Sequence, residues 1–516
     1  MPMSPSRQAS APTWDGQTLR LSLAAEGRCA LTIDGSRFCE LEAGDDGIAQ
    51  LCLPFSPSGN TVFDIRIDQD PIEAEGGPIA ASIEIGRPGL QPTIPMQPTL
   101  GALASAERPV PVEVEPMQRE VAVIVPVYNA AEGVARCLDS ILAHTTGPCR
   151  LIVIDDASTD PAIAPLLQRY RGIAGIDILA NEENRGFTAT VNRGMRHAGD
   201  ADVVLLNADT EVAAHWLTGL RRAACCAADV ATATAVSDNA GAFSVPELER
   251  ENPLPPGWTF AQTARALWQS AGHAYPQLPT GNGFCMYIRR EVLDEVGLFD
   301  VEAFPQGYGE ENDFCQRASA RGYRHLIAGN VFVAHARSQS FGIERRERLG
   351  RTGMQVLRER WPDYEADVGA MLFSFERRVL DWRVRRIHAM APQMQPLPRV
   401  LHLHAGEHPP LLSGYDSWMI TMHNQEWTLH GAHAEPLESA AAGPLASRHV
   451  SEWLQRHGFE WVAFGDGVDP GAAKLLAVQA RRLGIPALDI SAHPQTEPGA
   501  SAGSTNALRS FNGERP

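Results

Sequence analysis

Short apolar runs alternate with helical stretches between residues 120 and 212, and this alternation constrains the fold more than any other feature. The apolar runs are 121–125, 151–154, 176–179 and 203–206, and the helical stretches between them are 134–143, 163–170 and 188–197. Continuous apolar runs of this length suit strands that are covered on both faces. Strands that alternate with helices form a mostly parallel, doubly wound sheet with right-handed crossovers. The sequence therefore predicts an α/β domain.

Polar side chains follow three of these strands. They are Tyr128-Asn129 after the first strand, Asp155-Asp156 after the second and Asn207-Ala208-Asp209 after the fourth. Because open α/β sheets bind ligands at the carboxyl ends of their strands, we expect these groups to lie together around a ligand. On its own, Asp209 would be interpreted as the cap of a helix that begins near Val212. Three polar strand ends favour a site, where Asp209 could meet a divalent metal and, through it, a diphosphate.

Several nucleotide-binding and metal-binding classes are disfavoured by the sequence. The first strand is followed by PVYNAAEG (126–133), which lacks the GxGxxG of dinucleotide-binding folds. Lys474 is the single lysine, and it follows Gly471-Ala472-Ala473 without the rest of a P-loop pattern. The nine cysteines form no CxxC pair, which indicates reduced thiols and neither a zinc site nor a disulfide framework.

Length and charge set broader bounds. A chain of 516 residues can form about two to four domains with their own cores. The net charge of −18 argues against nucleic acid or a broadly anionic membrane surface as the main partner. No apolar run approaches the roughly 20 residues of a membrane span, and the N-terminus lacks the apolar core of a signal peptide. We therefore expect a cytoplasmic protein.

Changes in apolar periodicity and proline content along the chain predict the domain boundaries. The predicted parts are a disordered tail at 1–13, a β-sandwich at 14–90, a Pro-rich linker at 91–118, the α/β domain at 119–390 and a C-terminal α/β segment with a disordered tail at 391–516. Period-2 alternation between turn signals predicts the sandwich. Seven prolines in 88–116 indicate a semi-rigid linker.

The stretch 344–388 is predicted to be helical and is rich in arginine, with eleven Arg against eight Asp or Glu. Such a composition usually means a solvated helix face with paired charges. A cationic surface that meets the inner face of a membrane is the alternative. In the C-terminal segment, 400–404 and 461–464 are predicted strands, and 472–483 is a predicted helix before a further strand at 486–490.

Seven motifs in order resemble glycosyltransferase family 2. The first four are VAVIVPVYNA (121–130), LIVIDDASTD (151–160), ENRGFTATVNRGMRHA (183–198) and VVLLNADTEV (203–212). The last three are TGNGFCMYIRREVLDEVGLFD (280–300), GYGEENDFCQR (307–317) and VFVAHARSQSF (331–341). The resemblance covers about 119–390 and implies a GT-A fold: a doubly wound, mostly parallel sheet that performs inverting transfer from a nucleotide-sugar donor.

The resemblance also implies roles for residues on the donor side. The second-strand carboxylates Asp155 and Asp156 would bind the base and ribose of a UDP- or dTDP-sugar, with Asp156 favoured. The residues expected around the rest of the donor are Pro126, Tyr128, Asn129, Asn184, Asn207 and Gly283. Arg185 could reach the phosphates, or it could be a solvated side chain in a helix-start loop.

Metal and acceptor residues follow from the same resemblance. Asn207 stands where the family has the first acid of an Asp-x-Asp motif, which leaves Asp209 and His335 as the expected ligands of Mg²⁺ or Mn²⁺. Glu311 matches the acid that deprotonates the acceptor hydroxyl, and Glu310 would orient the acceptor. Adjacent carboxylates raise one another's pKa, which would bring one of them closer to the working pH.

The motifs 307–317 and 331–341 look most like bacterial rhamnosyltransferases and related enzymes of surface-polysaccharide assembly. The expected acceptor is then a glycan or lipid-linked glycan at the inner face of the membrane. Two alternatives stay open at this point. One is a sugar nucleotidyltransferase, although PVYNAAEG is not its Gly-rich loop. The other is a non-catalytic glycan-binding protein with a decayed transferase domain, for which Asn207 is the one hint.

Overall fold

The computed structural model describes the strands between Thr13 and Glu84, and residues 119–488 apart from short gaps. The gaps are 272–274, 337–342, 373, 394, 406–411, 424–425, 433–435, 442–445 and 466. The chain divides into two compact units, one made of 1–108 with 373–392 and the other of 109–372 with 393–516. The predicted tails and Pro-rich linker lie outside the described residues. No helix within the described ranges is both long and apolar enough to cross a membrane.

The first unit contains two antiparallel sheets, of order β1-β2-β5 and β4-β3-β6-β7. Their strands are β1 (Thr13–Trp14), β2 (Thr18–Ala24), β3 (Arg28–Ile33), β4 (Ser36–Glu42), β5 (Ile48–Pro54), β6 (Val62–Gln69) and β7 (Ile79–Glu84). Helix α11 (Phe375–Met390) contacts β4 and buries Val379, Leu380 and Trp382. The sequence analysis placed this helix at the end of the α/β domain, because its pattern does not reveal which core its apolar face covers.

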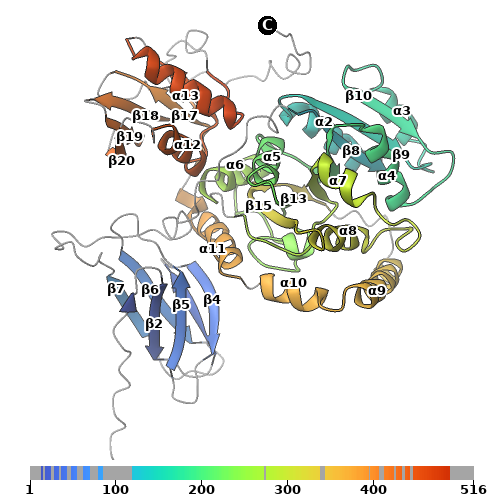
Figure 1. Cartoon of the computed structure of the whole chain (residues 1–516), viewed down its shortest axis with the longest axis horizontal. Helices are drawn as coiled ribbons and strands as arrows, with labels where there is room; N and C mark the ends of the chain where they lie inside the picture. The colour runs from blue at the N-terminus through green and yellow to red at the C-terminus, as the bar shows by residue number, and fades with distance from the viewer. Residues whose placement is uncertain are drawn as a thin grey trace, which may run out of the picture. The chain divides into compact units, whose positions relative to one another are not determined.

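The second unit is built on a seven-stranded sheet of order β10-β9-β8-β11-β14-β13-β15 (Figure 1). Its strands are β8 (Val121–Val127), β9 (Cys149–Asp155), β10 (Ile176–Ala180), β11 (Asp202–Leu206), β13 (Val230–Val236), β14 (Cys285–Ile288) and β15 (Arg324–Phe332). Every pair in this sheet is parallel except the two that β14 makes with β11 and β13. The predicted mostly parallel sheet is confirmed, and the four apolar runs are β8, β9, β10 and β11.

Helices connect and flank these strands. They are α2 (Ala131–His144), α3 (Ile163–Gln168), α4 (Phe187–His197), α5 (Trp216–Ala224), α6 (Phe260–Ser270), α7 (Arg290–Val296), α8 (Glu310–Ser319), α9 (Ile343–Arg360) and α10 (Tyr364–Leu372). Between β11 and α5, the two-residue strand β12 (Thr210–Glu211) pairs with β16 (Ala334–His335). Because α5 begins at Trp216 and has no side-chain cap, Asp209 is not the cap of this helix.

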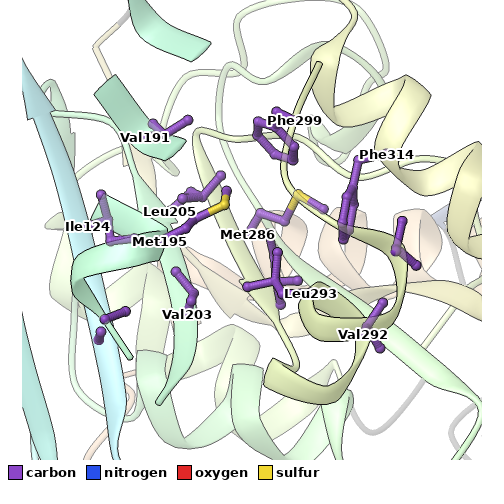
Figure 2. Packing of buried hydrophobic residues seen from close by; sticks show 14 of the residues in the cluster. Ile124, Val191, Met195, Val203, Leu205, Met286, Val292, Leu293, Phe299 and Phe314 are labelled. Carbon is purple, nitrogen blue, oxygen red and sulfur yellow. The ribbon is translucent and has the colours of Figure 1, made fainter. Parts of the chain in front are cut away.

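The core of the seven-stranded sheet is packed closely enough to fix the strand ends. Met195 of α4, Leu205 of β11, Met286 of β14 and Phe314 of α8 belong to one buried cluster (Figure 2). A Cβ atom at Gly194 would lie 2.5 Å from the Cγ2 atom of Ile124, so α4 can approach β8 only with glycine there. This contact places the N-terminus of α4 beside the carboxyl ends of β8 and β9.

A second, five-stranded sheet forms the C-terminal part, with the order β20-β19-β18-β17-β21. Its elements are β17 (Arg399–Leu403), β18 (Asp416–His423), β19 (Glu426–His430), β20 (Pro436–Ala441), β21 (Trp461–Phe464), α12 (Ala446–Arg456) and α13 (Pro470–Arg482). The sequence predicted β17, β21 and α13. It missed β18, β19 and β20, whose apolar runs are short and interrupted by polar residues.

Candidate active site

A cavity of about 420 Å³ opens at the carboxyl ends of β8, β9 and β11. The predicted site residues in its wall are Pro126, Tyr128, Asn129, Asp156, Asn184, Asn207, Asp209, Gly283, Glu310, Glu311 and His335. Asp155 and Arg185 are the two predicted residues that are absent from this wall. The structure therefore brings most of the predicted residues together, although they come from segments more than 200 positions apart.

One wall of the cavity is held by side chains that bond the backbone of neighbouring loops. Asn129, which has a left-handed backbone with φ of 60°, accepts hydrogen bonds from the N–H groups of Thr159 and Asp160 at 2.8 and 2.9 Å. Asp155 accepts one from the N–H of Ser158 at 2.9 Å. Both side chains thus shape the loop after β9, and Asp155 does so from outside the cavity.

Asp156 has a similar task at the start of α4. Its carboxylate is buried and accepts hydrogen bonds from Asn181 Nδ2 at 2.6 Å and from the N–H groups of Arg185 and Gly186, both at 2.9 Å. The same bonds turn the backbone so that the Arg185 side chain is exposed. Asp156 therefore holds the start of α4 in this wall, while the Arg185 side chain is exposed and lies outside the wall.

The polar group after β11 faces His335 of β16. His335 Nε2 lies 3.4 Å from Asp209 Oδ1 and 3.4 Å from Asn207 Nδ2. His335 Nδ1 lies 3.0 Å from the carbonyl oxygen of Asn239, and since a carbonyl only accepts, Nδ1 carries the proton. The backbone N–H of His335 donates to Asp238 Oδ1 at 2.9 Å. These contacts orient the ring so that Nε2 points toward Asp209 and Asn207.

The acidic pair at the start of α8 lies in another wall of the cavity. Glu310 is buried and accepts a hydrogen bond from the N–H of Gly309 at 3.0 Å. Burial, and after it the neighbouring Glu311 carboxylate, raise the pKa of Glu310 well above its ordinary value. Glu311 accepts from the N–H of Gly283 at 3.3 Å through Oε1, while its Oε2 is buried with no hydrogen-bond partner. The sequence predicted a raised pKa within the pair, and it falls on Glu310.

The loop before α8 is anchored to the wall formed by α4. The Thr188 hydroxyl donates to the carbonyl oxygen of Phe304. A Cβ atom at Gly186 would lie 2.6 Å from the carbonyl oxygen of Pro305, so this approach requires glycine. Further along the loop, Gln306, Gly307 and Tyr308 line the cavity. The start of α4 and the acidic pair are therefore held at a fixed separation.

Helix α9 closes the same side of the cavity with Leu349. Asp313 of α8 fastens its C-terminal end, since Asp313 Oδ1 accepts hydrogen bonds from Arg360 at 3.1 Å and from the indole of Trp361 at 3.2 Å. Asp313 Oδ2 accepts from Arg317 within α8 at 2.8 Å. The Asp313–Arg317 pair has the i, i+4 spacing of neighbours on one helix face. The sequence offers no signal for the link to α9, because the two residues of this contact are 47 positions apart.

The sequence of this chain is similar to those of known proteins. Residues 122–297 match the model of the family described as glycosyl transferase family 2. The chain carries a family 2 glycosyltransferase domain. Glycosyltransferase AglE of Haloferax volcanii is 23% identical over 241 residues, which cover 46% of this chain and 73% of that protein. The N-acetylglucosaminyl-diphospho-decaprenol L-rhamnosyltransferase of Mycobacterium tuberculosis (strain H37Rv) is 26% identical over 252 residues, covering 43% of this chain and 77% of that one.

Among solved structures, mannosyltransferase PcManGT from Pyrobaculum calidifontis in complex with GDP-Man and Mn²⁺ superposes with a TM-score of 0.37 at 20% identity. That match covers 56% of this chain and 81% of the other. The family match and the seven-stranded sheet establish a glycosyltransferase of GT-A fold. The family match decides against the sugar nucleotidyltransferase that the sequence left open.

Several residues in the wall of the glycosyltransferase cavity were missed by the sequence analysis. They are Ala130, Phe187, Thr190, Asn282, Phe284, Gln306, Tyr308 and Leu349. Phe284 stacks on the His335 ring with 5.3 Å between centroids, and Phe187 packs beside Gly283. Aromatic and aliphatic side chains in a motif look like core residues until the fold is known. For Tyr308, the flanking glycines were a usable signal.

Proposed function

We propose that this glycosyltransferase moves a sugar, with inversion, from a nucleotide-sugar donor to a hydroxyl group of a glycan or lipid-linked glycan, and that Glu311 is the general base. The observation that supports this most is the position of Glu311, which lies in the cavity wall with its Oε1 atom held by the N–H of Gly283. A carboxylate in the wall of the cavity can accept the proton of a hydroxyl group that binds beside it.

The proposed step proceeds as a single displacement. Glu311 accepts the proton of the acceptor hydroxyl as its oxygen forms a bond to the anomeric carbon. The bond from that carbon to the diphosphate breaks on the opposite face, and the electron pair leaves with the diphosphate. Gly283 holds Glu311 through its backbone N–H, so the base is oriented before the acceptor arrives. Burial, and after it the neighbouring Glu311 carboxylate, raise the pKa of Glu310, which disfavours a second negative charge beside the base.

A divalent metal fits the residues after β11. The fixed tautomer of His335 presents a lone pair beside the Asp209 carboxylate, which is the donor set that Mg²⁺ or Mn²⁺ accepts when phosphate oxygens complete it. Within the described residues, no three His, Cys, Asp or Glu side chains come together as ligands. From their contact with each other we assign Asp209 and His335 as the protein ligands of such a metal, with Asn207 beside them. A metal bound there would stabilise the negative charge of the departing diphosphate.

The donor side is assigned to the wall that Asn129 and Asp156 organise. Pro126, Tyr128 and Asn184 line this part of the cavity, which we propose receives the base and ribose of a UDP- or dTDP-sugar. The acceptor side is the wall with Glu311. Because one matched relative is named as an enzyme that acts on a diphospho-decaprenol, we further propose an acceptor of cell-surface polysaccharide assembly, met at the inner membrane face. Co-sedimentation with liposomes tests the membrane contact.

Glu311→Gln tests the base. We expect transfer to fall by about 10²–10⁴-fold, the usual contribution of a general base, while the Kd of the nucleotide in the presence of Mn²⁺ stays within about twofold. Glu302→Gln is the control, since this exposed acid precedes the same loop. Product formation is followed by mass spectrometry with UDP-, dTDP- and GDP-sugars. Wild-type rates in Glu311→Gln would remove the assignment.

A further inference from the structure

Three consecutive residues of the loop before α8 have a left-handed backbone. Gly307, Tyr308 and Gly309 have φ angles of 89°, 70° and 143°. Glycine adopts such angles freely, but a bulky aromatic residue does so at a cost. Strained conformations of this kind persist where surrounding structure enforces them, and they cluster at functional sites. Tyr308 is therefore an aromatic residue at a position whose backbone angle disfavours aromatic residues.

The surroundings leave this loop no room to relax. A Cβ atom at Gly309 would lie 2.5 Å from the ring of Phe304, and one at Gly353 of α9 would lie 1.8 Å from the carbonyl oxygen of Tyr308. The loop is thus held on one side by a buried ring and on the other by a helix that touches its backbone. Both contacts hold the backbone of this loop in place.

The Tyr308 ring lies in the wall of the cavity and is 36% exposed. Few large hydrophobic side chains in the described ranges are as exposed as this one. Leu349 of α9 lines the same region, and the proposed base Glu311 follows three residues along the chain. The ring is therefore an exposed apolar surface in the same cavity as the group that would receive the acceptor's proton.

We propose that Tyr308 is the platform on which the acceptor sugar binds, with its ring packed against the apolar face of a pyranose and Leu349 at the edge. This deepens the proposed function, on which it rests, by naming a pyranose as the group that carries the attacking hydroxyl. A pyranose presents a row of C–H groups on one face, and a rigid aromatic ring covers that face at little cost in side-chain entropy. Because the loop fixes the ring, the attacking hydroxyl is held beside Glu311.

The test compares Tyr308→Phe, Tyr308→Ala and Tyr308→Asn, using octyl glycosides of glucose, N-acetylglucosamine, galactose, mannose and rhamnose as acceptors. We expect Tyr308→Phe to stay within about threefold of wild type in acceptor KM, because the ring is kept. Tyr308→Ala and Tyr308→Asn should raise acceptor KM about tenfold, the loss that one aromatic contact predicts. The Kd of the donor nucleotide with Mn²⁺ should change little in all three.

A matched control separates strain from binding. Glu249 is exposed, has φ of 57° and lies outside the cavity wall. Since asparagine tolerates left-handed backbone, Tyr308→Asn and Glu249→Asn should both raise the Tm, by about 2–4 °C, but only the first should raise acceptor KM. The proposal would be overturned by a Tyr308→Ala or Tyr308→Asn protein whose acceptor KM equals that of the wild type. It would also be overturned by a Tyr308 variant that loses liposome binding while its acceptor KM is unchanged.

Failure of the proposed function gives a different result. If the wild type transfers no sugar from any donor, binding of the same octyl glycosides is measured by calorimetry with wild type and Tyr308→Ala. Weaker binding to Tyr308→Ala would then still support the platform. Equal binding, or no binding by the wild type, would overturn it.

Discussion

Two walls of the cavity use their polar groups in opposite ways. On the proposed donor side, the side-chain oxygens of Asn129 and Asp156 accept hydrogen bonds from backbone N–H groups of adjoining loops. On the proposed acceptor side, Glu311 keeps a buried oxygen without a partner, and Tyr308 keeps a strained backbone. The first wall is stabilised by its polar residues, whereas the second retains features that cost stability. The difference indicates that the polar residues of the first wall hold its loops in place, and that those of the second wall take part in the reaction.

Asp156→Ala should have the largest effect, because it breaks the frame. Its loss leaves the N–H groups of Arg185 and Gly186 without their acceptor and the amide of Asn181 with Thr190 Oγ1 alone, which costs about 2–4 kcal/mol. We expect a clear fall in Tm and a nucleotide affinity weaker by about a hundredfold or more. Asp155→Ala, which removes one such bond, is the control and should lose much less. A stable Asp156→Ala protein would contradict the framing role.

Asn207→Asp sharpens the assignment of the metal between the two walls. The substitution places a second carboxylate near His335 Nε2, which now lies 3.4 Å from the Asn207 amide. Hard divalent cations prefer carboxylate oxygens, so the Kd for Mn²⁺ should fall by about tenfold. Calorimetry with the metal and UDP measures it. Asp209→Ala should abolish the metal dependence of donor binding, and an unchanged metal dependence would remove Asp209 as a ligand.

Glu310→Gln tests whether the buried Glu310 carboxyl lowers the free energy of unfolding at high pH. Since the pKa of Glu310 is raised in the folded protein, the folded and unfolded states are both protonated below pH about 4.5 and differ increasingly above it. Stability is therefore lost as pH rises toward the folded pKa, and glutamine removes that loss. We expect Glu310→Gln to raise the Tm by about 2–4 °C at pH 8 and to leave it unchanged at pH 4.5. An equal change at both pH values would contradict burial of a protonated acid.

Arg185→Ala should have the smallest effect. The side chain is exposed and absent from the cavity wall, and the backbone N–H that bonds Asp156 is kept in alanine. We expect the donor KM to change by less than about threefold, which corresponds to a weak solvent-screened contact. A tenfold increase measured by steady-state kinetics would instead show that Arg185 turns inward to the phosphates.

The sequence predicted the donor wall better than the acceptor wall. The strands β8, β9 and β11 and their polar ends follow from periodicity, because a parallel sheet brings its carboxyl ends to one edge. Asp156 and Arg185 show the limit of that reasoning, since a motif does not reveal whether a side chain faces the ligand or the adjoining backbone. Glu311 was found through the family resemblance. Leu349 was missed because the contact of α9 with the 307–309 loop depends on tertiary packing.

The bonds from Asp313 to Arg360 and Trp361 join α8, which carries the acidic pair, to the end of α9, which carries Leu349. The end of α9 is therefore tied to α8, which stays in place when the rest of α9 is changed. An engineer who wishes to change the accepted glycan could exchange α9 for that of another enzyme and keep the reaction chemistry intact. Such a graft should retain Asp313, Arg360 and Trp361 as its joint, and vary the residues between Leu349 and Gly353.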